Sequence, residues 1–545
     1  MRDLWYKDAV IYCLDVETFQ DDDGDGIGDF KGLTRRLDHL AGLGVTCLWL
    51  LPFYPTPNRD NGYDIIDYYG VDPRLGTLGE FVEFMHEARE RGIRVIADLV
   101  VNHTSAEHPW FQEARDPSSD KHDWYVWSDE RPEDSSNQVI FPGVQEEIWT
   151  YDQKAKQYYL HRFYDHQPDL NIANPAVREE ICRIMGFWLE LGISGFRMDA
   201  APYMIELKGI EEQTDVAAPY EYLREFRDFL QWRRGDAILL AEANVTKEYV
   251  SEYFGDGKRM HMLFNFILNQ HLYLAFARRK AEPLKVGLRL PPDPPEDGQW
   301  AHFLRNHDEL NLGQLDKDQQ QEVFDAFAPD EDMRLYERGI RRRLPPMLDG
   351  DERRIRMAYS LLLTLPGTPV LRYGQEIGMG EDLSLEERRS VRTVMQWSDD
   401  ENGGFSKADP DELARPVLRE GPHGYEQVNV SDQRNDPESR LNWMERMIRL
   451  RKEHHAVGWG EWAILDTGHE AVLAHACRHR SSSLIAVHNL DEEECTVRLD
   501  LSDEPKGRVA DLLSERHYHE ISDDTTLEVD LNPFGYRWFH IDGET

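Results

Sequence analysis

The chain has 545 residues, 40% of them hydrophobic, and is long enough for two or three packed units around a large core. Its formal charge of −41 makes nucleic-acid backbones and anionic membranes unlikely partners. No stretch approaches the ~18 consecutive apolar residues of a membrane span.

The five cysteines are spread along the chain without the spacing of a metal site or of a disulfide framework. Three of them lie within apolar runs, so we expect buried free thiols. The N-terminal segment lacks the pattern of a signal peptide, and together with free thiols this predicts a reducing, cytoplasmic setting. The sequence is compatible with a monomer and with an oligomer.

Short apolar runs alternate with helical stretches from the N-terminus to about residue 376. The helical stretches at 33–44, 80–92 and 176–192 each place apolar residues on one stripe and end in a glycine. Eight strands are predicted, at 10–19, 45–52, 93–103, 193–200, 237–245, 262–268, 302–309 and 368–376. This alternation predicts an α/β fold, a (β/α)₈ TIM barrel. A doubly wound open sheet is the alternative, but the chain has no phosphate-binding glycine loop.

Two segments interrupt or follow this rhythm. About ninety residues separate the third and fourth predicted strands, which is too long for a simple connection. We therefore expect an inserted subdomain B at 104–170, above the C-terminal face of a barrel formed by 1–103 and 171–455. The strand-like pieces after residue 456 predict a C-terminal antiparallel β-sandwich at 456–545.

Acidic residues follow three predicted strands, at the barrel face where active sites lie. These are Asp199 in GFRMD, Glu242 after ILLA and Asp308 in RNHDE. Arg197 lies two residues before Asp199 on the same side of the strand and is expected to favour the ionised carboxylate of a nucleophile. Glu242 follows an apolar strand, where desolvation would raise its pKa and keep the proton of a general acid.

Any one of these carboxylates is more often a helix cap or an ion-pair partner than a catalyst, and Arg197, His103 and His307 also have structural interpretations. The combination is what indicates chemistry. Two carboxyl groups in different environments match the scheme of retaining glycosidases, in which they stand ~5–5.5 Å apart.

The chain contains YDI at 63–65, DLVVNH at 98–103, GFRMDA at 195–200, EAN at 242–244 and RNHDE at 305–309. With QPDLN at 167–171 and MQW at 395–397, these segments resemble the signature regions of the α-amylase superfamily, glycoside hydrolase family 13, over nearly the whole chain. The resemblance implies that Asp199 is the nucleophile, Glu242 the general acid and base, and Asp308 the carboxylate that binds sugar hydroxyls. It also implies a glucose subsite in which Tyr63 stacks on the ring and Arg392 lies beside Asp64, the remaining members being His103, Arg197 and His307.

Within the superfamily the chain is similar to the trehalose synthases, glucosyltransferases that interconvert maltose and trehalose. LWYKDAV at 4–10, LWLLPFYPTP at 48–57 and GIRRRL at 339–344 are among the similar segments. FNFILNQ at 264–270, Val394 and the segment 209–223 depart from that group's pattern, and several departures flank the acceptor side of the expected pocket. An α-glucosidase or amylase-type hydrolase, or a transferase with another acceptor, is the alternative function, and a non-catalytic scaffold is a third. Hydrolase and isomerase would share a β-glucosyl–Asp199 intermediate and differ in what attacks it next.

The segment DDDGDGIGD at 21–29 has the alternating acidic pattern of a calcium loop. It offers Asp21, Asp23, Asp25, the carbonyl of Ile27 and Asp29, although Gly32 stands where a full EF-hand has a glutamate. An acidic turn without a metal is the alternative. Similarity to trehalose synthases implies a second Ca²⁺ site, formed by Asn102, Asp169, Glu206 and the carbonyls of Tyr203 and Met204. No organic cofactor is expected, and the predicted partner is a small-molecule α-glucoside.

Overall fold

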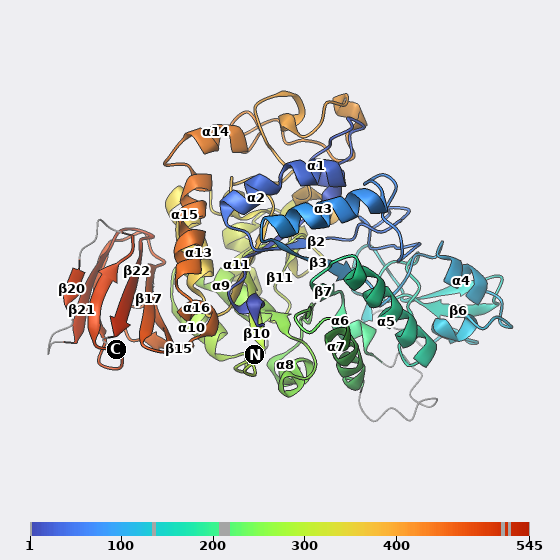
Figure 1. Ribbon diagram of the computed structural model, residues 1–545, viewed down its shortest axis with the longest axis horizontal. Helices are drawn as coiled ribbons and strands as arrows, with labels where there is room; N and C mark the ends of the chain where they lie inside the picture. The colour runs from blue at the N-terminus through green and yellow to red at the C-terminus, as the bar shows by residue number, and fades with distance from the viewer. Residues whose placement is uncertain (1–2, 133–137, 207–218, 514–517, 521–524, 544–545) are drawn as a thin grey trace.

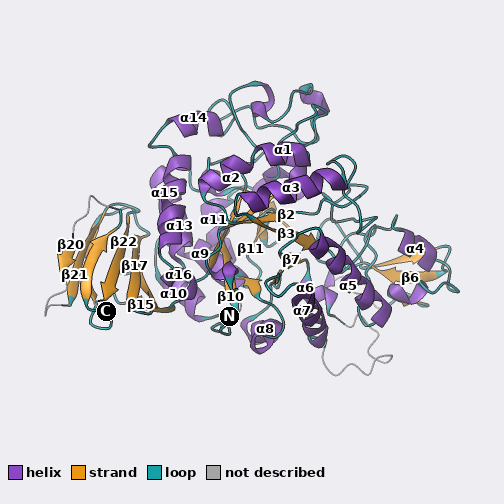
Figure 2. Cartoon of the chain, viewed as in Figure 1, coloured by secondary structure: helices purple, strands orange, loops and turns teal. Residues whose placement is uncertain are grey.

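The computed structural model describes residues 3–132, 138–206, 219–513, 518–520 and 525–543, and its centre is a closed barrel (Figures 1 and 2). Within these residues the parallel barrel strands pair in the order β1-β2-β3-β7-β8-β9-β10-β14, and β14 closes on β1. They are β1 (Ile11–Leu14), β2 (Cys47–Leu50), β3 (Arg94–Leu99), β7 (Gly195–Met198), β8 (Ile238–Ala241), β9 (Met262–Phe264), β10 (Gln299–Phe303) and β14 (Thr368–Arg372). The predicted barrel is confirmed, and the open sheet is wrong.

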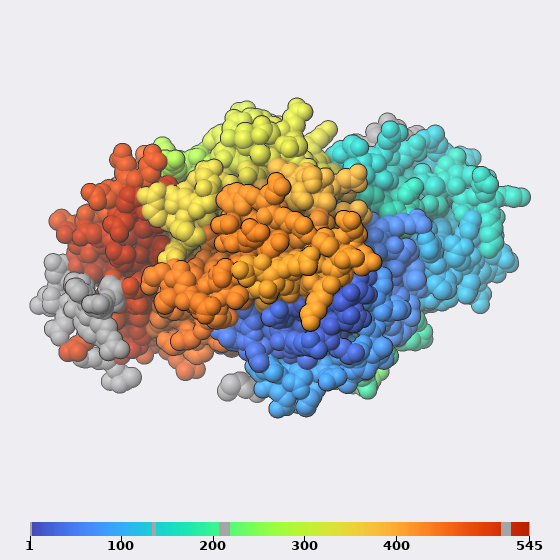
Figure 3. Space-filling view, turned by 90° about the horizontal axis from the view of Figure 1, so that it is seen from above, coloured from blue at the N-terminus to red at the C-terminus, as the bar shows by residue number. Residues whose placement is uncertain are grey.

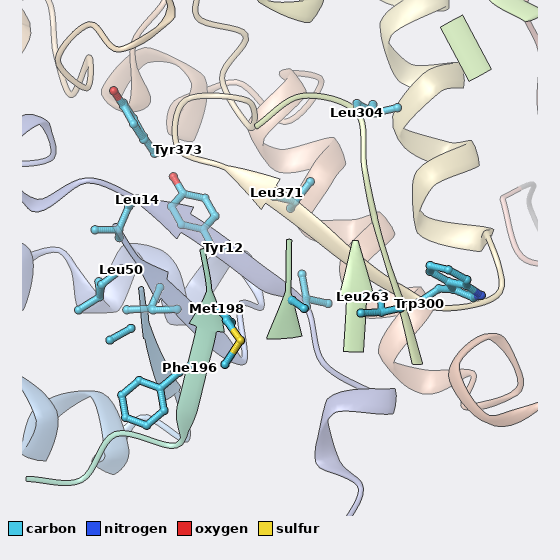
Figure 4. Packing of buried hydrophobic residues seen from close by; sticks show 14 of the residues in the cluster. Tyr12, Leu14, Leu50, Phe196, Met198, Leu263, Trp300, Leu304, Leu371 and Tyr373 are labelled. Atoms are coloured by element: carbon cyan, nitrogen blue, oxygen red, sulfur yellow. The ribbon is translucent and has the colours of Figure 1, made fainter. Parts of the chain in front are cut away.

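Each barrel strand is buried on both faces, which is why the sequence shows apolar runs there instead of alternation. In β2, Cys47 and Trp49 belong to the cluster that fills the barrel interior, whereas Leu48 and Leu50 belong to the larger cluster shared with the helices. Figure 4 shows this outer layer, with Tyr12, Leu14, Leu50, Phe196 and Met198 between strands and helices. Alternate side chains thus stabilise two cores from one short strand.

Helices cover the outside of the barrel. The stretch predicted at 33–44 forms two short helices that meet at Arg36, and Leu33, Leu37 and Leu40 are fully buried as expected. Gly44 ends the second helix with a φ of 95°, a conformation that favours glycine. The principal helices of this layer are α1 (Phe30–Arg35), α2 (Leu37–Leu43), α3 (Leu78–Glu90), α5 (Pro175–Glu190), α7 (Glu221–Arg233), α8 (Lys247–Phe254), α9 (Phe266–Arg278), α10 (Glu282–Arg289), α11 (Lys317–Phe327), α13 (Glu352–Thr364) and α15 (Arg440–Glu453).

All eight predicted strands end later in the sequence than the observed ones, and two of them show the reason most clearly. The run at 262–268 is a strand only as far as Phe264, because the Asn265 side chain accepts a hydrogen bond from the Leu268 N–H and caps α9. The run at 302–309 begins earlier, at Gln299, and the strand ends at Phe303. Residues 304–309, including Asp308, therefore lie in the loop beyond the C-terminal end of β10.

The insertion between β3 and β7 forms a small subdomain at one end of the molecule (Figures 1 and 3). It contains α4 (Pro109–Ala114) and a sheet in the order β4-β6-β5, with β4 (Trp127–Ser128), β5 (Trp149–Asp152) and β6 (Gln157–Leu160). Phe111 packs against both Tyr125 and Trp127 here, which accounts for several aromatic residues of this segment.

The C-terminal region lies at the opposite end (Figures 1 and 3) and consists of two antiparallel sheets. One has the order β15-β16-β17-β22-β19-β20, and β18 pairs with β21 in the other. Val497 of β18 and Val529 of β21 share a core with Ile485 and Ile541 of the larger sheet, so the predicted sandwich is confirmed. The strands are β15 (Glu461–Leu465), β16 (Val472–His479), β17 (Ser482–Asn489), β18 (Cys495–Asp500), β19 (Gly507–Asp511), β20 (Tyr518–Glu520), β21 (Thr526–Leu531) and β22 (Tyr536–Gly543).

Helix α13 joins the barrel to this sandwich through buried polar contacts. The Trp538 indole N–H donates to the Ser360 hydroxyl at 2.9 Å, and the same hydroxyl lies 2.9 Å from His488 Nε2. His475 Nε2 lies 2.8 Å from the Thr364 carbonyl. The sheet and the helix layer therefore share one buried interface. Across the part of the chain that the structure describes, no helix combines the length and the apolar character that a membrane crossing requires.

Candidate active site

The C-terminal ends of the barrel strands surround a cavity of about 710 Å³, within the ~300–1,000 Å³ of small-molecule pockets. Asp199 directly follows β7, Glu242 directly follows β8, and Asp308 lies in the loop after β10. All three line the cavity, as do Tyr63 and His103. The structure thus brings the predicted catalytic carboxylates together, from segments more than forty residues apart in the sequence.

One guanidinium joins the carboxylates at the base of the cavity. Arg197 Nη1 donates to Asp199 Oδ1 at 2.6 Å, and Arg197 Nη2 donates to Glu242 Oε2 at 2.7 Å. Arg197 also donates to Asp98 at 2.5 Å, because Asp98 of β3 and Arg197 of β7 are paired residues in the barrel register. Bonds from one guanidinium to both carboxyl groups place them close together, as the shorter spacing of retaining enzymes requires.

The pKa values of the two central carboxyl groups do not diverge as the sequence suggested. Burial raises the pKa of Asp199 to about 7, and Arg197 offsets only part of this effect. Burial likewise raises the pKa of Glu242 to about 7. Arg197 pairs with Glu242 and Asp98 as well as with Asp199, so its charge does not separate the pKa values of the two central carboxyl groups. The group therefore titrates as a coupled set in which protons are shared.

Asp308 has the opposite environment. Arg388 Nη1 and Arg392 Nη2 donate to Asp308 Oδ1 at 3.0 and 2.8 Å. Burial alone would raise the pKa of Asp308, but the adjacent His307 and the two guanidiniums hold it well below its usual range. Burial lowers the pKa of His307 itself, so Arg388 and Arg392 supply the permanent positive charge beside Asp308.

Tyr63 lines the cavity and is fixed by its neighbours. Its hydroxyl donates to Asp98 Oδ2 at 3.1 Å and lies 2.7 Å from His307 Nε2. The Tyr63 and His307 rings stack with centroids 5.8 Å apart. His103 Nε2 lies 3.1 Å from the Tyr63 carbonyl, so the histidine and the tyrosine fix each other's position.

The family model described as "Alpha amylase, catalytic domain" matches residues 13–327 and 341–460 of the chain. The chain belongs to the α-amylase family. It is therefore a glycoside-processing enzyme whose catalytic unit is the barrel. A second model, "Sucrose hydrolase-like, C-terminal domain", matches residues 482–540 within the sandwich.

Proteins of known name resemble nearly the whole chain. A trehalose synthase of Thermus thermophilus is 43% identical over 99% of this chain, which spans 56% of that protein's length. The trehalose synthase/amylase TreS of Mycolicibacterium smegmatis is 44% identical over 86% of this chain and 80% of its own. The crystal structure of an α-amylase from H. orenii superposes with a TM-score of 0.78 at 26% identity, covering 98% of this chain and 99% of that one.

Two expected members of the glucose subsite make contacts other than the expected ones. The Asp64 carboxylate is fully buried and accepts hydrogen bonds from the Thr56 hydroxyl and the backbone N–H groups of Arg59 and Asp60. Arg392 contacts Asp308 and the His307 carbonyl. Neither Asp64 nor Arg392 is among the described residues that line the cavity, whereas Asp60 is.

The acidic loop near the N-terminus gathers three of its predicted metal ligands. Oxygen atoms of Asp21, Asp23 and Asp29 lie within 4.8 Å of one another. Asp25 is outside this group, and one of its oxygens accepts from the Ile27 N–H. Both Asp21 oxygens accept backbone N–H bonds, from Gly24 and Gly26, and this folds the loop around its carboxylates. The donor set fits a hard cation such as Ca²⁺ at three of its predicted side chains.

The second predicted metal set is only partly assembled. Asn102 Nδ2 donates to Asp169 Oδ1 at 3.3 Å, which brings two expected ligands together. Glu206, however, forms a 2.6 Å ion pair with Arg162, and the Arg162 N–H donates to Asp169. Arg162 therefore contacts two of the predicted ligands, Glu206 through its guanidinium and Asp169 through its backbone N–H, and the second metal site stays a prediction. Tyr203 lines the cavity, and Met204 is buried beside it in the short helix α6 (Ala201–Met204).

Sequence reasoning missed Asp98 and Arg388. Asp98 stands within the recognised segment DLVVNH, and the pairing of β3 with β7 could have placed it opposite Arg197. Arg388 is four residues before Arg392 and donates to both Asp308 and Asp60, at 3.0 and 2.9 Å. Its segment lacks apolar periodicity, and no local signal distinguished it from the neighbouring arginine.

Proposed function

We propose that this chain is an α-glucosyltransferase that interconverts maltose and trehalose through a covalent β-glucosyl–Asp199 intermediate. The observation behind the retaining mechanism is that Arg197 bonds to Asp199 and Glu242 at once, which sets a nucleophile and an acid side by side. The choice of sugars rests on relatives named trehalose synthases that are 43 and 44% identical to the chain.

In the first half-reaction, the ionised Asp199 attacks C1 of the terminal glucose unit of maltose. The bond between C1 and the glycosidic oxygen breaks, and Glu242 transfers its proton to that oxygen as glucose leaves. Asp308 binds hydroxyls of the glucose that stays, and its permanent charge stabilises the positive charge that develops at C1. Tyr63 and His103 form the wall on which that ring rests.

In the second half-reaction, the released glucose presents its anomeric hydroxyl to C1 of the intermediate. Glu242, now ionised, takes the proton from this hydroxyl as the new C1–O bond forms and the bond to Asp199 breaks. The product is trehalose, and the same steps in reverse return maltose. Attack by water at this stage gives hydrolysis, the second candidate function, which the relative named synthase/amylase supports.

Incubation with maltose, followed by product analysis over time, tests the proposal. We expect trehalose to accumulate ahead of free glucose, and the reverse reaction to yield maltose from trehalose. Glucose as the only product would contradict the isomerase and favour the hydrolase. Asp199→Asn should abolish turnover of every α-glucoside, and the conserved circular dichroism spectrum of the variant would exclude misfolding as the cause.

A bound Ca²⁺ and a cytoplasmic location complete the proposal. Ca²⁺ held by Asp21, Asp23 and Asp29 would fix the loop that packs against residues 404–406, since Asp21 also accepts from the Ser406 hydroxyl. The metal lies outside the reaction itself. The five cysteines are all free thiols, and Cys13, Cys47 and Cys477 are buried, which supports a reducing compartment.

A further inference from the structure

The acceptor side of the cavity can be located from the position of Glu242. A general acid must reach the glycosidic oxygen, so the leaving sugar and any sugar that replaces it lie against the wall next to Glu242. All of the following residues line the cavity. We assign to that wall Asn244 and Val245, which follow Glu242 in the sequence, with Asn311 and Gln314, and we assign Tyr63, His103 and Asp308 to the glucose side.

Gln314 connects two segments of the acceptor wall. Its side-chain Nε2 donates to Asn244 Oδ1 at 2.5 Å and to the Val245 carbonyl at 3.2 Å. Asn244 is two residues beyond Glu242, so this contact ties the Gln314 loop directly to the segment of the acid and base. Both amide protons of Gln314 are thereby used. Gln314 lines the cavity, and its Oε1 accepts no hydrogen bond from the residues that the structure describes, which leaves it as an acceptor.

A buried residue, Gln270, fixes the backbone of Gln314 by a hydrogen bond. The Gln314 N–H donates to Gln270 Oε1 at 2.8 Å, and Gln270 is fully buried in helix α9. The preceding residue, Asn269, donates to the Phe303 and Leu304 carbonyls at 2.7 and 3.1 Å at the end of β10. Helix α9 therefore fixes the Gln314 loop against a barrel strand, and the amide side chains of FNFILNQ have a structural purpose.

These contacts fix which groups of the acceptor wall are hydrogen-bond donors and which are acceptors. Because Asn244 Oδ1 accepts from Gln314, the Asn244 amide nitrogen remains as a donor, next to Gln314 Oε1 as an acceptor. A sugar carries several hydroxyls, each able to donate and to accept, and can use both groups at once. A water molecule needs no such alignment to attack C1, since it has no orientation of distant hydroxyls to satisfy.

We propose that Gln314, held in place by Gln270, orients the acceptor sugar and favours transfer of the glucosyl group to a sugar hydroxyl over transfer to water. The inference rests on the proposed function, because both require the β-glucosyl–Asp199 intermediate. In the step concerned, the acceptor oxygen bonds to C1, the C1–Asp199 bond breaks, and Glu242 takes the hydroxyl proton. Gln314 is a positioning residue for this step and takes no proton.

The partition of the intermediate between sugar and water tests this role. A p-nitrophenyl α-glucoside serves as donor and isotopically labelled glucose as acceptor. Nitrophenol release counts every turnover, and mass spectrometry of labelled disaccharide counts the transfers. Their ratio does not depend on how much of the enzyme is folded, so a partly unstable variant still gives an interpretable result.

We expect Gln314→Leu to lower the ratio of transfer to hydrolysis about tenfold, the effect of losing one or two neutral hydrogen bonds, and to raise the KM for the labelled glucose. Gln270→Leu should lower the ratio in the same direction by a smaller factor, because it frees the Gln314 backbone without removing the side chain. Gln321→Ala is the matched control, since Gln321 is exposed on α11 and bonds only to Asp325 among the described residues.

A ratio within twofold of wild type in Gln314→Leu would overturn the inference. An equal loss of transfer and hydrolysis would also overturn it, since that pattern indicates a purely structural role. Failure of the proposed function is a separate result. In that case wild type makes no trehalose from maltose, while the labelled glucose can still be incorporated through other linkages, and the effect of Gln314 on that incorporation remains measurable.

Discussion

Arg388 donates a hydrogen bond to Asp308 across 3.0 Å, although 80 residues separate them in the sequence. The other guanidinium nitrogen bonds to Asp60 at 2.9 Å, and the group lies over the Phe141 ring at 5.0 Å. Arg388 thus joins the loop after β2, the inserted subdomain and a catalytic carboxylate. It shares the charge of Asp308 with Arg392, so the two arginines hold that carboxylate from two directions.

Replacement of Arg388 should therefore impair substrate binding and the transition state together. We expect Arg388→Ala to lower kcat/KM on α-glucosides by one to two orders of magnitude, as loss of a charge-assisted bond predicts. Arg389→Ala is the control, because this neighbour has no side-chain bond among the described residues. Equal kcat/KM values for the two variants would mean that Arg388 does not position Asp308.

The coupled pair Asp199 and Glu242 predicts a bell-shaped pH profile. Catalysis needs one ionised and one protonated carboxyl, and burial raises the pKa of each to about 7. Below neutrality the nucleophile is lost by protonation, and above it the acid is lost by ionisation. We expect kcat/KM on maltose to fall on both sides of neutrality, and a profile that stays flat to pH 9 would contradict the raised pKa values.

The decline of kcat/KM at alkaline pH should depend on ionisation of Glu242 alone. A nitrophenolate leaving group departs without protonation, so glycosylation of Asp199 by an aryl α-glucoside does not require Glu242 as an acid. In Glu242→Gln we expect the burst of nitrophenol to lose its alkaline decline and to keep the acidic one. Persistence of the alkaline decline would assign it to another group.

Glu242 should also make the folded protein less stable at high pH than at low pH. The pKa of Glu242 rises from an ordinary ~4.3 to about 7 on folding, so the native state gains protons relative to the unfolded chain. The contribution of Glu242 to the free energy of unfolding is fully present below the pKa of the unfolded chain and is lost as the pH rises through the folded pKa of about 7. The loss is on the order of 3 kcal/mol.

Glu242→Gln removes this penalty. We expect the Tm of the variant minus that of wild type to increase between pH 5 and 8 and to change little above that range. Glu83→Gln, at an exposed position on α3, should show no such trend. A difference in Tm that is independent of pH would show that Glu242 titrates normally.

Calcium binding at the acidic loop can be measured through stability. Calcium that binds the folded chain alone stabilises it by about 2.7 kcal/mol at 100 times Kd. Addition of Ca²⁺ to chelator-treated protein should raise the Tm, and Asp23→Asn should abolish the increase. Asp25→Asn should retain most of it, since Asp25 lies outside the cluster. An unchanged Tm in wild type would contradict the site.

The sequence predicted what depends on local pattern. Continuous apolar runs, typical of strands that are buried on both faces, indicated the barrel strands. The positions of Asp199 and Glu242 directly after β7 and β8 follow from the boundaries of these strands. Three aspartates of the acidic loop come together because Gly24 and Gly26 turn the chain around them.

What depended on packing between distant segments was not predictable in the same way. The sequence placed Arg197 beside Asp199, but the barrel register also puts Asp98 next to it, and this shared cation removes the expected divergence of pKa values. Arg388 reaches Asp308 through a loop without periodicity. The segment 209–223, which departs from the trehalose synthase pattern, lies largely outside the described residues.

The contact between Ser360 and Trp538 bears on how the catalytic unit could be isolated. Without the sandwich, helix α13 would expose the Ser360 hydroxyl and the Thr364 carbonyl together with the apolar surface that the indole covers. A fragment that ends near residue 460, where the match to the catalytic family model ends, would thus expose an apolar surface through which copies of the fragment could associate. The sandwich therefore covers an apolar surface of the helix layer outside the barrel. We expect either part to aggregate when the other is removed.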